Sequence, residues 1–321
     1  MPRRKPIPPS KGPSGSAEPR GLRELDRFTE ASLHKWSILS KDLDELHDVL
    51  FFSLEPERRR LRSELIASLD AAMPIAFQMR RWVRIVTYQY SHTPLSCAGS
   101  LQSYGGRFNV GVDVEESTLN PWSALYLAQD FETAFREKFA LSSNETVNGL
   151  TPQELALEHG TSHSTVFVLG SLSRLFDIRD QVALRPLASI LRKIEMPARA
   201  RQLMKKLQIP SHALHMANNA KRIHDTVSKH NWRMWPVQFG LPAPSHILAD
   251  LVRQAGYEGI IYRSSKGPGD CVALFPEQLA SASFVELADA GPPQVALSRL
   301  DELTASKLNG WDSVVPAKRL R

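Results

Sequence analysis

Five short runs of β-type residues constrain the fold of this 321-residue chain more than any other feature. The runs lie at 82–86, 124–128, 164–169, 259–262 and 270–275. They are rich in Val, Ile, Leu and aromatic residues, and such short apolar runs favour strands. Leucines at helical spacing precede them, as at Leu61, Leu65 and Leu69. The pattern predicts a chain of mixed helices and strands.

The same pattern divides the chain into four parts. Residues 1–22 are rich in Pro, Ser, Gly and basic residues, so we expect a disordered basic arm with little to bury. Residues 23–80 are expected to be a helical accessory region. Residues 81–285 contain all five β-type runs and are expected to form the main domain, with a basic helical insertion at about 185–232. Residues 286–321 are poorly patterned and are expected to be a tail.

Composition and charge narrow the class of protein. Hydrophobic residues make up 42% and charged residues 23%, as in ordinary soluble globular proteins. The net charge of +6 favours polyanionic partners such as nucleotides, nucleic acid or an acidic protein, without choosing among them. Cys97 and Cys271 are the only cysteines, so a disulfide framework is excluded and a reducing cytoplasm is the expected location. No apolar run approaches the roughly 18 residues of a membrane span, and no signal core is expected at the N-terminus.

The segment Tyr104–Asn109, Tyr-Gly-Gly-Arg-Phe-Asn, is the most informative local motif. Glycines allow a sharp turn and close approach of a ligand. Arg107 behind them offers a rigid fork of donors suited to phosphate. When the segment is considered alone, a solvated turn is the more common explanation of such a motif.

A helix is predicted from Asp130, as its N-cap, to about Leu141. An apolar stripe at helical spacing is expected to face the core. Its members are Phe131, Ala134, Phe135 and Phe139. Glu132 and Arg136 are expected to form a surface ion pair. Glu137 has no cation among its neighbours on the helix, so a half-buried carboxylate here needs a partner from elsewhere in the fold.

A polar loop, Arg263–Gly269, joins the last two β-type runs. It contains hydroxyls at Ser264 and Ser265, which with backbone amides are able to hold phosphate. A simple polar hairpin turn is the alternative interpretation. Metal motifs are not found, because the pairs His159/His163 and His212/His215 lack the further ligands of a zinc site. There is also no Walker loop and no Gly-x-Ser-x-Gly elbow.

Taken in chain order, these pieces resemble the RES domain, a family named for its Arg, Glu and Ser. The matching positions are Arg84 in the first β-type run, Arg107 in Gly-Gly-Arg-Phe-Asn, Tyr126 in Ala-Leu-Tyr-Leu-Ala, Glu137 in Thr-Ala-Phe-Arg-Glu, and Ser264 in Ile-Ile-Tyr-Arg-Ser. The resemblance covers about residues 81–179 and 232–285. The chain departs from the compact family pattern by its N-terminal helices, by added residues between Asn109 and Tyr126, and by the helical insertion.

RES domains are toxins of bacterial toxin–antitoxin systems that degrade NAD⁺. The resemblance therefore implies an α+β fold, a compact mixed sheet with flanking helices similar to ADP-ribosyltransferase toxins. It implies an enzyme that cleaves the nicotinamide–ribose bond, as an NAD⁺ glycohydrolase or an NAD⁺ phosphorylase. NAD⁺ would be the substrate, no further cofactor is expected, and inorganic phosphate is a candidate co-substrate. The implied partner is an antitoxin with a helix-turn-helix domain.

The resemblance also assigns roles to individual residues. The catalytic candidates are Glu137, Arg107 and Tyr126, and the substrate-binding candidates are Arg84, Arg107, Asn109, Tyr126 and Ser264. Glu137 would support the oxocarbenium-like transition state or bind the ribose hydroxyls to orient the sugar, while Arg84 and Arg107 would clamp the pyrophosphate. Whether Ser264 or Ser265 is the matching serine stays open.

Two other function classes remain as alternatives. The same pocket could transfer ADP-ribose to a macromolecule. The basic composition and basic helices also allow a non-catalytic protein that binds nucleic acid directly, which would show salt-sensitive binding and no NAD⁺ turnover.

Overall fold

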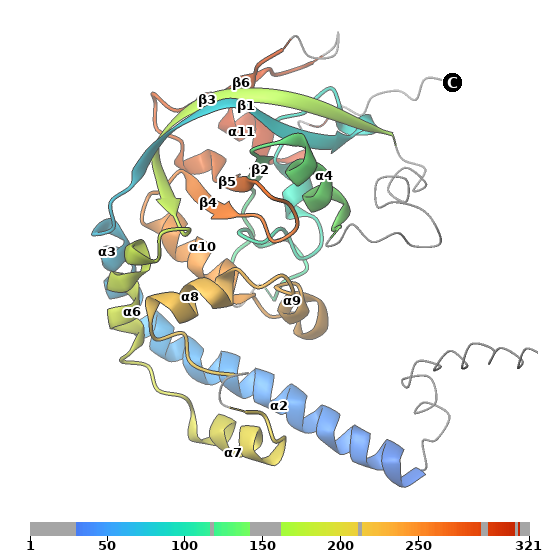
Figure 1. Ribbon diagram of the computed structural model, residues 1–321, viewed down its shortest axis with the longest axis vertical. Coiled ribbons are helices and arrows are strands. Elements are labelled where there is room, and N and C mark those ends of the chain that lie inside the picture. Colours follow the sequence, from blue (N-terminus) through green and yellow to red (C-terminus); the bar gives the residue numbers. More distant parts are fainter. Residues whose placement is uncertain are drawn as a thin grey trace, which may run out of the picture.

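The structure is a computed structural model (Figure 1). It describes residues 30–115, 119–141, 162–210, 214–289, 295–311 and 314, with side chains from residue 37 onward. The predicted arm at 1–22 lies outside these residues, as do His159 and His212.

A seven-stranded mixed sheet forms the body of the molecule. The strands are β1 (Ile75–Thr87), β2 (Leu125–Ala128), β3 (His163–Asp177), β4 (Gly259–Arg263), β5 (Asp270–Leu274), β6 (Phe284–Leu287) and β7 (Arg299–Asp301). Their order is β1-β2-β5-β4-β3-β6-β7, and β1 also pairs with β3. Five strands thus close into a ring, from which β6 and β7 extend. All five β-type runs of the sequence are strands, and the predicted α+β class is confirmed.

The long strands β1 and β3 arch over the shorter strands β2, β4 and β5 (Figure 1). They pair antiparallel, with Arg84 opposite Val166. The register shifts between Met79 and Trp82, where Arg81 adopts a φ of 54°, which marks a β-bulge. Because β1 begins at Ile75, the strand crosses the expected domain boundary at residue 81.

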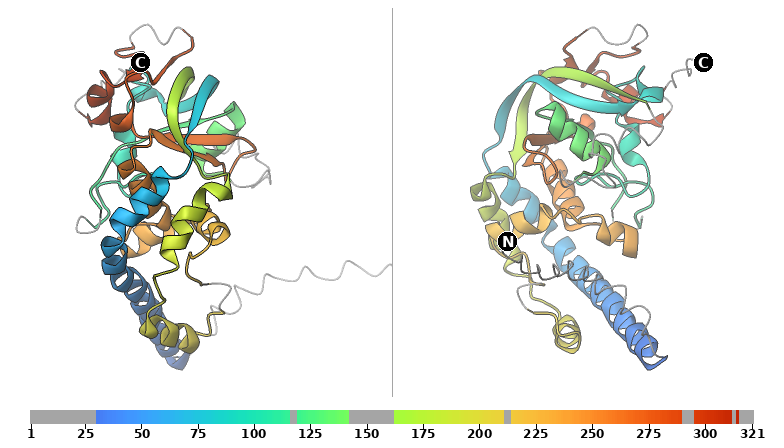
Figure 2. Two further views of the ribbon diagram at one scale, coloured as in Figure 1. Left: turned by 90° about the vertical axis from the view of Figure 1, so that its left-hand side faces the viewer. Right: turned by 45° about the vertical axis from the view of Figure 1, so that its right-hand side comes forward.

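Helices lie below this sheet and along one side of it (Figure 2). Their bounds are α2 (Glu30–Arg60), α3 (Arg62–Asp70), α4 (Phe131–Phe139), α6 (Arg185–Leu191), α7 (Ala198–Lys206), α8 (Ala220–Val227), α9 (Met234–Phe239), α10 (Pro244–Gln254) and α11 (Ala305–Asn309). Short 3-10 turns occur at Tyr88–Tyr90, Ala98–Leu101, Gln181–Leu184 and Pro276–Gln278.

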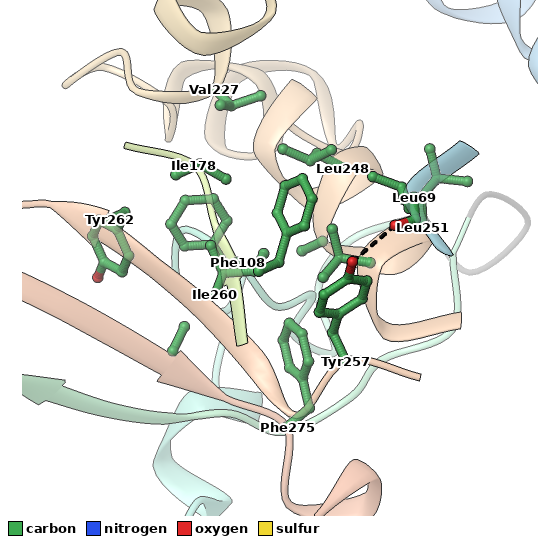
Figure 3. Close-up of a cluster of buried hydrophobic side chains, with 14 of the residues drawn as sticks. Leu69, Phe108, Ile178, Val227, Leu248, Leu251, Tyr257, Ile260, Tyr262 and Phe275 are labelled. Atoms are coloured by element: carbon green, nitrogen blue, oxygen red, sulfur yellow. Dashed lines mark hydrogen bonds between the residues drawn. The ribbon is translucent and has the colours of Figure 1, made fainter. Parts of the chain in front are cut away.

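The main core lies between the sheet and helices α3, α8 and α10 (Figure 3). Phe108 is fully buried there, with its ring centroid 4.7 Å from that of Tyr262. Tyr257 is also fully buried, and its hydroxyl donates to the carbonyl of Leu69 at 2.8 Å. A hydroxyl satisfied in this way fixes the end of α3 against the turn that leads into β4. A second cluster, centred on residues such as Leu172 and Leu274, packs the other face of the sheet.

The N-terminal helices and the helical segment at 185–232 form one layer. Helix α7 packs along α2 through Leu46, Leu50 and Leu203, and α6 packs against α3. An ion pair at 2.6 Å between Arg199 and Glu45 adds to the α2–α7 contact. The two segments that sequence analysis treated as separate additions are therefore packed on each other and on the domain.

Helix α4 begins at its predicted N-cap, since Asp130 accepts a hydrogen bond from the Thr133 backbone N–H at 2.7 Å. Its orientation differs in part from the prediction, because Ala134 of the expected apolar stripe is buried but the aromatic members are not. Phe131 is 51% exposed and Phe135 is only half-buried, whereas Thr133 and Ala134 are buried. The helix lies close against β1 and β2. Small side chains fit that gap, and the aromatic rings are displaced to the outer side.

The segment expected to be a C-terminal tail also contributes to the fold. Strand β7 pairs with β6, and Leu300 and Leu308 are fully buried in the second cluster. The elements are too short to produce a recognisable periodicity in the sequence.

Candidate active site

The glycine turn is held by a buried amide. Asn109 is fully buried, and its Oδ1 accepts from the Gly106 backbone N–H at 2.8 Å and from the Tyr126 hydroxyl at 2.9 Å. Its Nδ2 donates to the carbonyls of Ser100 at 2.7 Å and Trp122 at 2.9 Å. An amide that uses both its donor and its acceptor in this way locks the turn. Asn109 thus supports the turn, and its predicted contact with substrate stays a prediction.

Both glycines of the turn are required by the geometry. Gly105 has a φ of 83°, a conformation that other residues adopt only under strain. A Cβ on Gly106 would overlap the ring of Tyr126. The Tyr126 hydroxyl also accepts from the Phe108 backbone N–H at 2.9 Å, so this phenol holds the turn through two hydrogen bonds. Burial raises the pKa of Tyr126 and keeps the hydroxyl protonated.

Arg107 projects from this turn and is only 6% exposed. Its Nη1 donates to the carbonyl of Lys229 at 3.0 Å, and its Nη2 donates to the hydroxyl of Ser265 at 2.6 Å. The guanidinium is therefore fixed from two segments that are distant in sequence. Because its orientation is already fixed, the guanidinium can bind a ligand with little further loss of conformational entropy.

The β4–β5 loop lies on the first turn of α4. The Gly269 backbone N–H donates to the Thr133 hydroxyl at 2.8 Å. A Cβ on Gly267 would come within 2.6 Å of the Thr133 Cα, so the loop requires glycine at this close approach. This contact brings the serines of the loop to the face of α4 that carries Glu137.

Ser264 supplies the missing partner of Glu137. The Ser264 hydroxyl donates to Glu137 Oε1 at 2.6 Å and accepts from the backbone N–H groups of Lys266 at 3.0 Å and Gly267 at 2.8 Å. A hydroxyl bonded in this way orients the carboxylate and is not a nucleophile. Both serines left open by the sequence take part, because Ser265 contacts Arg107 while Ser264 contacts Glu137.

Arg84 lies on β1 and donates from Nη2 to the carbonyl of Ser96 at 2.7 Å. Its Nε is buried and has no hydrogen-bond partner among the described residues. Burial lowers the pKa of Arg84. Lys138, which follows Glu137, is exposed, yet partial desolvation and the nearby charge of Arg84 lower its pKa. Two cations are thus held close together at a cost in free energy, which a bound anion would offset.

These groups surround one cavity of about 440 Å³, a size typical of small-molecule sites. It is lined by Arg84, Arg107, Tyr126, Glu137, Lys138, Arg233, Tyr262 and Lys266, among others. Glu137 is the one carboxylate among the described residues of the lining, against five Lys and Arg side chains. The cavity is therefore suited to an anionic ligand held next to a single carboxylate.

The structure brings Arg84, Arg107, Tyr126 and Glu137 together around this cavity, with Ser264 behind Glu137. Sequence reasoning did not identify Lys138, Arg233 or Tyr262 as part of the site. Lys138 could have been suggested by its place next to Glu137. Arg233, whose guanidinium lies 4.7 Å from the Trp232 ring centroid, stands in no recognisable motif.

These observations define a class of protein, one with an α+β fold and a cationic cavity around one carboxylate. A family model described as the RES domain matches residues 184–292, about a third of the chain, and confirms the predicted resemblance. The match includes Ser264 and also the helical segment at 185–232, which the sequence analysis had set apart as an insertion. Arg84, Arg107, Tyr126 and Glu137 precede it.

Among solved structures, the chain is similar to one in the M. tuberculosis MbcT–MbcA toxin–antitoxin complex. The sequences are 13% identical, the alignment covers 76% of this chain and 96% of the other, and the TM-score is 0.37. None of the curated proteins compared with the chain matches it. No helix in the described ranges is long and apolar enough to cross a membrane.

Proposed function

We propose that this protein is an enzyme that consumes NAD⁺ by cleaving the bond between nicotinamide and ribose, and that it is the toxin of a toxin–antitoxin pair. The observation that carries the proposal is the convergence of Arg84, Arg107, Tyr126 and Glu137 on one cavity. These residues come from segments that are far apart in the sequence. The RES domain match supports the choice of NAD⁺ as substrate, because RES domains degrade NAD⁺.

The charge of the cavity suits the pyrophosphate of NAD⁺. A guanidinium binds phosphate oxygens through two parallel N–H donors, and such charge-assisted bonds are about twice as strong as neutral ones. Arg107 is already oriented by Lys229 and Ser265. Arg84 lines the same cavity and adds a second guanidinium for the phosphate oxygens.

The single carboxylate suits the chemistry of the ribose. When the glycosidic C–N bond breaks, its electron pair leaves with nicotinamide, which becomes neutral and needs no general acid. Positive charge then develops on the ribose C1″ and ring oxygen, and Glu137 lies in the cavity to stabilise it. Ser264 keeps this carboxylate oriented through its 2.6 Å hydrogen bond.

The acceptor completes the reaction in one of two ways. Addition of water with loss of a proton gives ADP-ribose, and addition of inorganic phosphate gives ADP-ribose 1″-phosphate. The cationic lining is compatible with phosphate as co-substrate. Proton and phosphorus NMR of NAD⁺ incubated with the purified protein, with and without phosphate, identifies which product forms.

A matched pair of variants on helix α4 tests the role of the carboxylate. We expect Glu137→Gln to abolish NAD⁺ loss. Glu132→Gln removes an exposed carboxylate of the same helix, which pairs with Arg136 and does not line the cavity, and should retain activity. Turnover by Glu137→Gln at the wild-type rate would exclude this mechanism.

The toxin role is tested in cells. Expression of the wild-type protein should deplete NAD⁺ and stop growth, while Glu137→Gln should do neither. We propose that the antitoxin partner contains a helix-turn-helix domain. Coexpression of this antitoxin should restore growth, and the antitoxin should copurify with the protein. Normal growth with intact NAD⁺ levels under wild-type expression would contradict the proposal.

A further inference from the structure

His246 is a fully buried histidine that does not line the cavity. It lies in the first turn of α10, where its Nδ1 accepts from the Ala243 backbone N–H at 3.2 Å. Its Nε2 lies 2.8 Å from the carbonyl oxygen of Gly106. Because Nδ1 accepts a hydrogen bond, the proton of the neutral ring is on Nε2, which donates to Gly106. The environment thus fixes the tautomer.

The two neighbours of this ring are both connected to Arg107. Gly106 is the residue immediately before Arg107 and packs against the ring of Tyr126. On its other side, His246 contacts the ring of Trp232, with centroids 5.4 Å apart. Trp232 follows closely after Lys229, whose carbonyl accepts from the Arg107 guanidinium. His246 therefore contacts both the backbone that carries Arg107 and the segment that receives its side chain.

We propose that His246 is a positioning residue that sets the Gly106 peptide, and through it the Arg107 guanidinium, in the substrate cavity. The inference rests on the proposed function, because it is there that Arg107 binds the pyrophosphate. The rigid ring carries an acceptor and a donor at a fixed separation, so it has two structural functions. It caps the N-terminus of α10 and holds the glycine turn.

Two substitutions separate the capping of α10 from the hydrogen bond to Gly106. In His246→Asn, the amide oxygen stands near the former Nδ1 and keeps the acceptor for Ala243, but the side chain is too short to reach Gly106. In His246→Gln, the amide N–H₂ stands near the former Nε2 and keeps the donor to Gly106. If His246 positions Arg107, glutamine rescues function and asparagine does not.

Steady-state kinetics gives the first readout. We expect His246→Asn to raise the KM for NAD⁺ about tenfold, the effect of losing one good hydrogen bond to a bound charge, with a smaller change in kcat. His246→Gln should stay within about threefold of wild type, a difference below the value of a single such bond. A purely structural role predicts instead that activity follows the melting temperature in both variants. Equal losses in the two variants, or a wild-type KM in His246→Asn, would overturn the inference.

A second readout does not depend on turnover. The Nε–H resonance of the buried Arg107 is assigned in ¹H–¹⁵N spectra by its loss in Arg107→Lys. This resonance should shift or broaden in His246→Asn and remain in place in His246→Gln. An unchanged resonance in His246→Asn refutes the positioning role, whether or not the wild-type protein consumes NAD⁺. A protein that shows the expected shift but no NAD⁺ turnover would refute the proposed function alone.

Discussion

The burial of His246 makes a quantitative prediction about stability and pH. Burial disfavours the charged imidazolium and lowers the pKa of His246 from its ordinary value of 6.5 to about 4, although the hydrogen bond to Gly106 acts in the opposite direction. In the unfolded chain the pKa returns to the ordinary value. Between these two values the unfolded state binds a proton that the folded state does not.

The direction and size of the effect follow from this difference. The free energy of unfolding is unaffected by His246 above its ordinary pKa and falls as the pH drops towards 4. At about 1.4 kcal/mol for each pH unit, the complete loss is about 3 kcal/mol, and about 2 kcal/mol of it occurs between about pH 7 and about pH 5. Net stabilities of small domains are only about 5–15 kcal/mol, so this loss is measurable.

Urea unfolding of the wild-type protein and of His246→Gln over this pH range is the appropriate assay. Other groups with lowered pKa values, such as His47 and His163, titrate in both proteins and cancel in the difference. Glutamine does not titrate, so the stability advantage of the wild type over the variant should shrink by about 2 kcal/mol between about pH 7 and about pH 5. Parallel curves for the two proteins would show that His246 is not a buried neutral histidine.

Three further substitutions test other parts of the site and fold. Ser264→Ala removes the donor to Glu137 and should lower NAD⁺ turnover about tenfold while destabilising the protein by about 1–3 kcal/mol, since two backbone N–H groups lose their acceptor. Kinetics and urea unfolding measure both effects, and a wild-type kcat would contradict the role of this serine. Gly106→Ala should abolish activity and cost about 1–3 kcal/mol, because the added methyl group displaces the Tyr126 ring, and a variant with normal turnover and melting temperature would refute the close packing. Glu258→Gln should cost about 1–3 kcal/mol in urea unfolding, because the amide that replaces this buried carboxylate has one acceptor oxygen fewer for the backbone N–H groups bonded to it. An unchanged midpoint would show that these hydrogen bonds contribute little to stability.

Strands β1 to β5 were predictable because each contains a compact apolar run with a clear local signal, whereas the short strands β6 and β7 were not predicted. Helix α4 shows where such reasoning ends. Periodicity correctly placed Phe131 and Phe135 on one side of the helix, but it contains no information about which side meets the sheet. That choice depends on the space above β1 and β2, which admits Thr133 and Ala134 and not an aromatic ring.

The site was predictable where a residue stands in a motif and unpredictable where its role depends on distant partners. The sequence indicated that Glu137 needs a partner from outside its helix, and the structure identifies Ser264. By contrast, His246 is a lone histidine after a proline-rich loop. Its importance arises from contacts with Gly106 and Trp232, which are distant in the sequence and have no local signature.

The helical segment at 185–232 helps to orient Arg107 in the cavity. Its sequence pattern indicates an addition to a complete domain, yet the carbonyl of Lys229 within it accepts from Arg107, and its Trp232 contacts His246. The acceptor is a backbone atom, so no side chain at position 229 would reveal it in a sequence. The same segment packs through α6 and α7 on the N-terminal helices α3 and α2. The orientation of Arg107 therefore depends on a layer of helices that begins well before the first strand.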